Sequence, residues 1–234
     1  RTATVVTEVA PGVDANADVK LGDRVAVEYE TPGVARMVRV DAALIARIDA
    51  VTAPGRLPVL GQQVAINVDG ALGPITQFGG GYMKPADLRA GDAVEVHGLL
   101  VQQGGSAQVL ATRVERLATL PGYVRASGIV SSLQSGAVPG FALGALAVHI
   151  AGAPVLPAGI ALANGQTVTV LALAANVTPR TPGTWDMVAA QVRIGEPGTA
   201  VVSAHRDTHF AFLEDVVAGD LISITRDDGQ LFTY

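Results

Sequence analysis

The segment ADLRAGDAVEV, residues 86–96, decides the fold of this chain, because close copies of it recur along the sequence. The copies are ADVKLGDRVAV (17–27), IALANGQTVTV (160–170) and DVVAGDLISI (215–224). In each copy a glycine is followed by Asp or Gln and then by apolar residues at alternate positions. Glycine readily adopts positive φ, the side chain after it can bond nearby backbone, and the alternation buries one face of a strand. The repeat therefore predicts, at each copy, a tight turn that leads into a half-buried β-strand.

The sequence around these copies also recurs, and it divides the chain into similar units. We expect opening strands at 44–51 and 126–133, hairpins at 60–66 and 143–149, and closing strands at 34–40, 108–115 and 171–177. A unit of about five short strands is typical of a small OB-like β-barrel. We therefore predict a mainly β protein of tandem small OB-like barrel repeats: a shortened repeat over 1–40, then repeats over 41–118 and 119–180.

Residues 178–184, TPRTPGT, are predicted to be a linker, because proline cannot join a central strand. Residues 181–234 then form the last unit. Residues 41–180 resemble uncharacterised β-repeat domains of exported bacterial proteins, a resemblance that carries no assigned activity.

The composition excludes several classes of function. Hydrophobic residues make up 49% of the chain, which indicates a globular protein. A net charge of −5 argues against nonspecific nucleic-acid binding. The absence of cysteine excludes disulfides, thiol catalysis and thiolate metal sites. The sequence has no apolar run long enough to predict a membrane span. The chain opens on Arg1 and stops within an alternating strand, so we expect it to be cut from a longer protein.

The sharpest motif lies in residues 195–210, GEPGTAVVSAHRDTHF. A Gly-x-Pro-Gly turn, a strand ending in His-Arg-Asp-Thr-x-Phe, a short helix and a Gly-Asp strand follow one another here. This order resembles the middle of a sortase, a cell-envelope transpeptidase, of the small proteobacterial-type group. The resemblance implies a partial sortase-like β-barrel segment over about 195–234, with His205 in the place of the family's catalytic histidine. Thr199 and Ala204 stand where the family usually has Asn and Gly.

The resemblance also implies the chemistry that this segment would serve. In sortases a Cys thiolate attacks the Thr–Gly carbonyl of a sorting signal such as L-P-x-T-G, and the acyl group then passes to an amine. The histidine moves protons near the nucleophile and an Arg stabilises the oxyanion. In the family both Cys and Arg come later in sequence than the segment that this chain matches. The chain therefore shows the histidine of the family without its nucleophile.

Three other roles are open to the residues of this motif. Ser203 shares a strand face with His205, but the sequence identifies neither an orienting acid nor an oxyanion donor for a serine nucleophile. His205 and His209 would form a metal-binding pair only on a helix, whereas 203–205 has the pattern of a strand. We therefore expect neither a metal nor a cofactor. The third interpretation makes His205 a polar residue that closes a strand, with Arg206 and Asp207 paired at the surface.

The other polar residues of note have structural interpretations. His97 and His149 are expected at solvent-facing or half-buried strand positions. Aspartates of the repeated phrase are expected to form turns rather than to bind calcium; they are Asp23, Asp92 and Asp220. The Gly79-Gly80-Gly81 run is expected to be a flexible tip surrounded by Phe78, Tyr82 and Met83, and it lacks the Lys-Ser/Thr of a phosphate loop.

Together these features predict an exported bacterial β-repeat protein, periplasmic, in the cell envelope or extracellular. It would act as a binding, spacer or cell-envelope module with a catalytically incompetent sortase-like tail. Its expected partners are a cell-envelope protein or polysaccharide, and not nucleic acid; the oligomeric state is left open. The alternative is the N-terminal portion of a sortase whose Cys and Arg lie beyond Tyr234.

Overall fold

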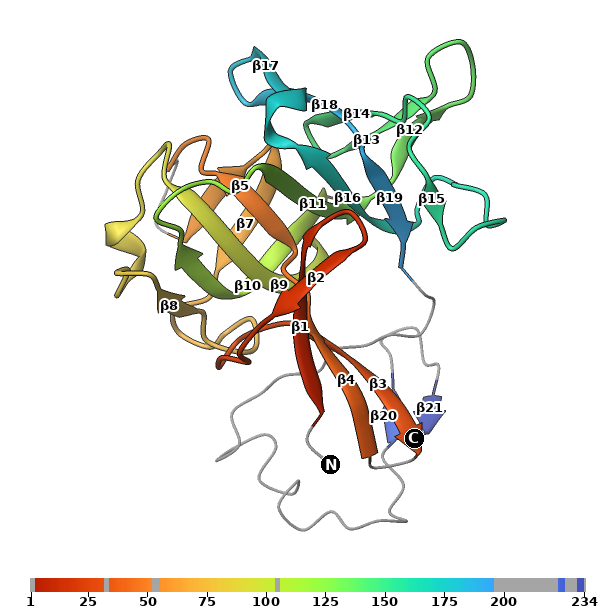
Figure 1. Cartoon of the computed structure of the whole chain (residues 1–234). Coiled ribbons are helices and arrows are strands. Elements are labelled where there is room, and N and C mark those ends of the chain that lie inside the picture. The colour runs from red at the N-terminus through yellow and green to blue at the C-terminus, as the bar shows by residue number, and fades with distance from the viewer. Residues whose placement is uncertain are drawn as a thin grey trace.

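The computed structural model describes residues 3–31, 34–51, 55–103, 106–195, 223–225 and 231–233, and it is almost entirely β-structure (Figure 1). The helical elements of these residues are two short 3₁₀ turns, η1 (Pro85–Asp87) and η2 (Ala174–Asn176). The mainly β class predicted from the sequence is confirmed. No helix in the described part of the chain has the length and apolar character needed to cross a membrane.

The first repeat is a four-stranded sheet with the strand order β2-β1-β4-β3. Its strands are β1 (Thr4–Ala10), β2 (Val13–Asn16), β3 (Val25–Thr31) and β4 (Val34–Val40).

The second repeat closes into a small barrel. Its strands are β5 (Leu44–Arg47), β6 (Arg56–Val59), β7 (Gln62–Ile66), β8 (Gln77–Gly79), β9 (Ala93–Gln103) and β10 (Ser106–Arg116). Neighbouring strands run β5-β9-β10-β7-β6, and a bridge between Ile48 and Val59 joins the two ends of this series. This closure is the OB-like arrangement that the sequence predicts.

The third repeat begins at β11 and extends to residue 194. Its strands are β11 (Tyr123–Ile129), β12 (Ser131–Gln134), β13 (Gly140–Leu143), β14 (Leu146–His149), β15 (Val155–Leu156), β16 (Thr167–Leu173), β17 (Val177–Thr181), β18 (Thr184–Val188) and β19 (Gln191–Ile194). A separate pair, β20 (Ser223–Thr225) and β21 (Leu231–Thr233), completes the described strands.

The predicted glycine turn is present in all three copies of the phrase that the structure describes. Gly22, Gly91 and Gly165 have φ of 89°, 86° and 87°. In each turn the N–H of the following residue, 23, 92 or 166, donates to the carbonyl oxygen three residues earlier, at 3.0, 3.2 and 3.3 Å. Glycine occupies this position because a side chain would strain a backbone with positive φ.

The three repeats also share one register. In each, the fifth residue after the turn glycine pairs antiparallel with the closing strand, which pairs parallel with an earlier strand. The three rows of paired residues are Val27–Val38–Val5, Val96–Val114–Phe78 and Val170–Val192–Val155. Strands β3, β9 and β16 are therefore equivalent, as are β4, β10 and β19.

The second and third repeats share one continuous sheet through their opening strands. Leu44 of β5 lies opposite Val96, and Ala126 of β11 lies opposite Val170. Leu44 and Ala126 are therefore equivalent residues, and they also pair directly with each other. Such pairing of equivalent residues is the mark of an approximate two-fold arrangement, as in an isologous dimer.

Two predictions for the end of the third repeat are wrong. Residues 171–177 do not form a closing strand: β16 ends at Leu173, η2 follows, and β17 begins at Val177. Residues 178–184 are not a linker but belong to the β17–β18 hairpin. Pro179 is tolerated there because β17 lies at the edge of its sheet, where one side of the strand donates no ladder hydrogen bond.

Strands β18 and β19 together take the closing role that β10 has in the second repeat. β18 pairs parallel with β14 as β10 does with β7. β19 pairs with β16 and β15 as β10 does with β9 and β8. The third repeat therefore needs residues up to Ile194 to complete its sheet.

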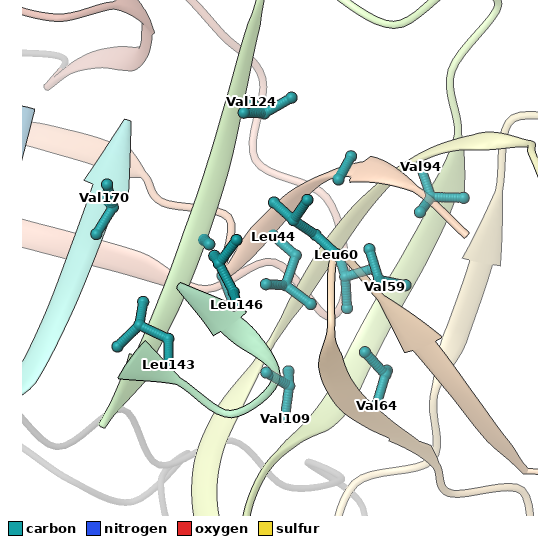
Figure 2. Packing of buried hydrophobic residues seen from close by; sticks show 14 of the residues in the cluster. Leu44, Val59, Leu60, Val64, Val94, Val109, Val124, Leu143, Leu146 and Val170 are labelled. Atoms are coloured by element: carbon teal, nitrogen blue, oxygen red, sulfur yellow. The ribbon is translucent and has the colours of Figure 1, made fainter. Parts of the chain in front are cut away.

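One aliphatic core runs through the second and third repeats. Leu44 and Leu60 of the second repeat lie close to Leu146 of the third, and Val64 and Leu143 belong to the same buried cluster (Figure 2). All five side chains are buried. The two repeats are thus held together by apolar packing as well as by the β5–β11 pairing.

Candidate functional site

The motif with the strongest functional signal lies outside the described residues. The predicted residues that lie outside the described part of the chain are Ser203, His205, Arg206, Asp207, His209 and Asp220. Two polar clusters among the described residues lie at the junction between the first repeat and the shared sheet, and both are built from ion pairs.

The first cluster, here the Glu8 cluster, consists of Glu8, Arg24, Asp41, Arg125 and Arg193. Arg125 Nη2 lies 2.7 Å from Asp41 Oδ1 and 3.5 Å from Glu8 Oε2. Arg193 Nη2 lies 3.1 Å from Glu8 Oε1, and Arg24 Nη2 lies 3.2 Å from Asp41 Oδ2. The side chains of Arg125 and Glu8 are 0% and 1% exposed. Three repeats therefore meet at one buried group of charges.

The position of this cluster follows from the sheet order. Arg125 lies in β11, at the centre of the ten-stranded sheet, and Glu8 lies in β1 of the first repeat. The backbone N–H of Gly12 also donates to Glu8 Oε1, at 2.9 Å, and the Tyr123 hydroxyl donates to the Glu8 carbonyl oxygen, at 3.2 Å. Buried charges need such partners, because removal from water is costly. The cluster fixes where β1 docks on the sheet.

The second cluster, here the His97 cluster, consists of Asp23, Arg24, Glu95, His97 and Arg113. His97 Nδ1 accepts the backbone N–H of Arg24 at 3.2 Å, which places the ring proton on Nε2. Nε2 lies 3.0 Å from Glu95 Oε1 and 3.5 Å from Asp23 Oδ1. The side chain of His97 is 3% exposed, so the prediction of a solvent-facing or half-buried histidine is wrong. The turn of the first repeat covers it.

Asp23 forms its turn as expected and also reaches the second repeat. Its Oδ2 accepts the backbone N–H of Lys20 at 2.7 Å, and its Oδ1 lies 3.6 Å from Arg113 Nε. At the rim, Glu115 accepts hydrogen bonds from Lys20 Nζ and Arg113 Nη2 at 2.7 Å each. Although burial acts in the opposite direction, these cations hold the pKa of Glu115 below its ordinary value.

The first repeat also approaches β10 through its backbone. Thr112 Oγ1 donates to the Gly22 carbonyl oxygen at 2.6 Å, and a Cβ on Gly22 would lie 2.5 Å from the Thr112 carbonyl oxygen. A Cβ on the equivalent Gly91 would meet nothing within 4 Å. Gly22 is therefore required both for its backbone conformation and for this close contact.

The expected flexible tip at Gly79–Gly81 is a packed structure instead. Gly79 ends β8, which pairs with β10, and a Cβ on Gly80 would lie 2.0 Å from the Arg116 carbonyl oxygen. Tyr82 is buried and donates to Asp92 Oδ2 at 2.6 Å. Burial, followed by this hydrogen bond, raises the pKa of Tyr82. Asp92 thus holds Tyr82 through its side chain and closes the repeated turn through its backbone N–H.

The remaining polar residues support structural roles. His149 is half-buried as expected, and its Nε2 lies 3.4 Å from Asp186 Oδ1. In the described part of the chain, no group of three or more His, Asp or Glu side chains is arranged to hold a metal ion. The Glu8 cluster and the His97 cluster hold the repeats together through ion pairs and hydrogen bonds. Local sequence patterns do not indicate the pairing of Glu8 with Arg125, because these two residues lie 117 positions apart.

Two families match parts of the chain. Residues 153–234 match a family described as Sortase domain, and residues 46–115 match one described as Domain of unknown function (DUF5666). No curated protein sequence matches the chain. The sequence resemblance to sortases is thus supported for the C-terminal part, over less than half of the chain.

The boundaries of these matches can be compared with the fold. The match at 46–115 covers the barrel of the second repeat, from β5 to β10. The sortase match begins at residue 153, so it includes β15–β19, which complete the sheet of the third repeat. The segment similar to sortases is therefore continuous with the repeat fold.

Proposed function

We propose that the three repeats form a non-catalytic binding or spacer module of an exported bacterial protein, joined to a catalytically incompetent sortase-like segment. The observation that carries this proposal is the lack of any cysteine in a chain that matches the sortase domain. Sortase chemistry needs a thiolate nucleophile, and residues 1–234 contain no cysteine for the histidine of the motif to serve.

The described polar clusters favour the same conclusion. The carboxylates and guanidinium groups of the Glu8 cluster pair with one another across repeats. His97 is enclosed by Asp23, Glu95 and the backbone of Arg24. These groups stabilise a particular arrangement of repeats, which is the property of a scaffold. Export and a cell-envelope location are compatible with the match to the sortase domain.

A transpeptidation assay tests this function. The whole chain is incubated with a labelled L-P-x-T-G peptide and an amine acceptor, and a cysteine-containing sortase serves as the positive control. We expect neither cleavage nor a new amide product. Turnover that disappears in the Ser203→Ala variant would contradict the proposal and identify a serine nucleophile.

The alternative function, the front portion of a working sortase, is favoured by one observation. The family match at 153–234 includes His205, which stands in the place of the family's catalytic histidine. Sequencing the coding region past Tyr234 distinguishes the two. An in-frame Thr-Leu-x-Thr-Cys strand followed by an Arg would make His205 a catalytic acid or base.

A further inference from the structure

The first repeat is joined to the shared sheet in a different way from that in which the second and third repeats are joined to each other. In the described structure its four strands pair only with one another, whereas β5 and β11 join the other two repeats in one sheet. The aliphatic core that runs through those two repeats contains no described residue of 1–40. Figure 1 shows β1, β3 and β4 extending away from the second and third repeats. The contact between residues 1–40 and the shared sheet, here the seam, is therefore built from other interactions.

Ion pairs and hydrogen bonds form the seam. Glu8 of β1 pairs with Arg125 and Arg193 of the shared sheet, and Lys20 Nζ lies 2.7 Å from Glu115 Oε1 of β10. The side chains of Lys20 and Glu115 are 48% and 22% exposed, so salt screens this pair and it contributes little. Polar contacts of this kind between domains ordinarily permit the domains to move relative to each other.

The buried part of the seam is incompletely satisfied. Arg125 is fully buried and pairs with Glu8 and Asp41 through Nη2, but its Nε and Nη1 have no hydrogen-bond partner in the described structure. A buried donor without a partner costs free energy, because it has given up its hydrogen bonds to water. Release of the first repeat returns these donors to water. The closed arrangement therefore carries a cost that an open arrangement does not.

The covalent connection across the seam is short. The N–H of Asp41 donates to the Arg24 carbonyl oxygen of the first repeat at 2.9 Å, whereas the N–H of Ala43 donates to the Val96 carbonyl oxygen of the second at 2.8 Å. Ala42 thus lies between a residue held by the first repeat and a residue held by the shared sheet. A few residues at the ends of elements are enough to absorb the φ/ψ changes of a domain motion.

We infer that the first repeat is a hinged cap on the shared sheet: residues 1–40 leave the sheet as a unit by rotation about Ala42, while the second and third repeats stay folded. Opening breaks the ion pairs of Glu8 and Lys20 across the seam and uncovers Arg125 and His97. The chain is then a spacer with two lengths, a closed one and an open one. This inference goes beyond the proposed function, because it concerns a motion within the module.

His97 reports on the cap, because both of its ring nitrogens are engaged when the cap is closed. Nδ1 accepts the N–H of Arg24 at 3.2 Å, and Nε2 lies 3.0 Å from Glu95 Oε1. Diethyl pyrocarbonate acylates imidazole nitrogens that are free and accessible to solvent, so it should modify His97 only after the cap opens. His149, whose side chain is 40% exposed, is the reference in the same chain. Trp185, the single tryptophan, reports by its fluorescence on the fold of the third repeat.

The experiment treats the whole chain with diethyl pyrocarbonate at pH 7 in increasing urea, and peptide mass spectrometry measures the rates at which His97 and His149 are modified. We expect His149 to react throughout, and His97 to react at urea concentrations well below the Trp185 fluorescence transition. Simultaneous onset of His97 modification and the Trp185 transition would overturn the inference, because no separate opening would exist. Modification of His97 as fast as His149 without urea would also overturn it, because the cap would not close.

A first pair of matched variants tests the buried part of the seam without urea. Glu8→Gln removes a charge that pairs across the seam, whereas Asp14→Asn removes one that pairs with Arg39 inside the first repeat. We expect about tenfold faster modification of His97 in Glu8→Gln and no change in Asp14→Asn. The Trp185 transition should change little in either variant.

A second pair of variants tests the rim of the seam, where a substitution is less disruptive to folding. Lys20→Met removes the pair with Glu115 across the seam and should accelerate the modification of His97 about threefold. Arg36→Met removes an exposed pair with Glu28, which lies inside the first repeat, and it should have no effect.

Equal acceleration by the two members of either pair would overturn the inference. The stability of the first repeat itself, and not the seam, would then limit the exposure of His97. The transpeptidation assay measures a separate property, so failure of this inference and failure of the proposed function are distinguishable.

Discussion

Replacement of Arg125 with methionine should lower the free energy of unfolding by about 3–5 kcal/mol, the usual cost of breaking a buried ion pair. The substitution leaves Glu8 and Asp41 with one fewer cation in a site where Glu8 is almost fully buried. Because single domains are stable by only about 5–15 kcal/mol, a change of this size is easily measured by urea unfolding. In the variant, the backbone amides of β1 should also lose most of their protection against hydrogen exchange.

Arg193→Met is the matched control for this variant. Arg193 pairs with the same carboxylate, Glu8, but its side chain is 33% exposed. We expect a smaller loss, on the order of 1 kcal/mol, since exposed ion pairs contribute little. Equal effects of the two substitutions would contradict the view that the buried Glu8–Arg125 pair fixes the docking of the first repeat.

The second large effect is expected at β18, in the segment that the sequence assigns to the start of a tail unit. Met187 is 0% exposed and lies opposite Val148 of β14 and Val177 of β17. Met187→Ala should cost about 2–5 kcal/mol, because it removes buried atoms and leaves a cavity. Thermal or urea unfolding measures this change.

Val188 offers a control one residue along the same strand. Its side chain points to the other face and is exposed. Val188→Ala should change the free energy of unfolding by no more than about 0.5 kcal/mol. If Met187→Ala were equally mild, β18 would not be part of the core of the third repeat.

The sequence predicts the repeated elements well because they depend on local chemistry. The glycine turn requires positive φ, and the alternation after it requires a half-buried strand; both features are visible within ten residues. Gly22, Gly91 and Gly165 accordingly have the predicted backbone conformation. The prediction of a small closed barrel rests on the same local signal, a unit of about five short strands.

The end of the third repeat was harder to predict because its closing strand is split. In the second repeat one long strand, β10, pairs with β7, β8 and β9, whereas in the third this role is divided between β18 and β19. The inserted η2 and β17 separate them from β16, so the alternation in 171–177 indicated a strand in the wrong place.

The buried polar clusters could not be predicted from local patterns at all. His97 has the spacing of an ordinary strand residue, and its burial comes from the turn at residues 20–24, more than seventy positions away. Glu8 and Arg125 are hidden in the same way, since an isolated charge in a strand usually faces solvent. Only the docking of the first repeat on the shared sheet brings these groups together.

Strands β18 and β19 belong to the third repeat, so this repeat extends into the segment that matches the sortase domain. Two shortened chains, one ending at Gly195 and one ending at Arg180, test it directly by urea unfolding. We expect the chain ending at Gly195 to keep a cooperative transition with the stability of the full chain, because β20 and β21 pair only with each other in the described structure. The chain ending at Arg180 should lose the third repeat, since β14, β15 and β16 lose their pairing with β18 and β19. Equal stability of the two shortened chains would contradict the claim.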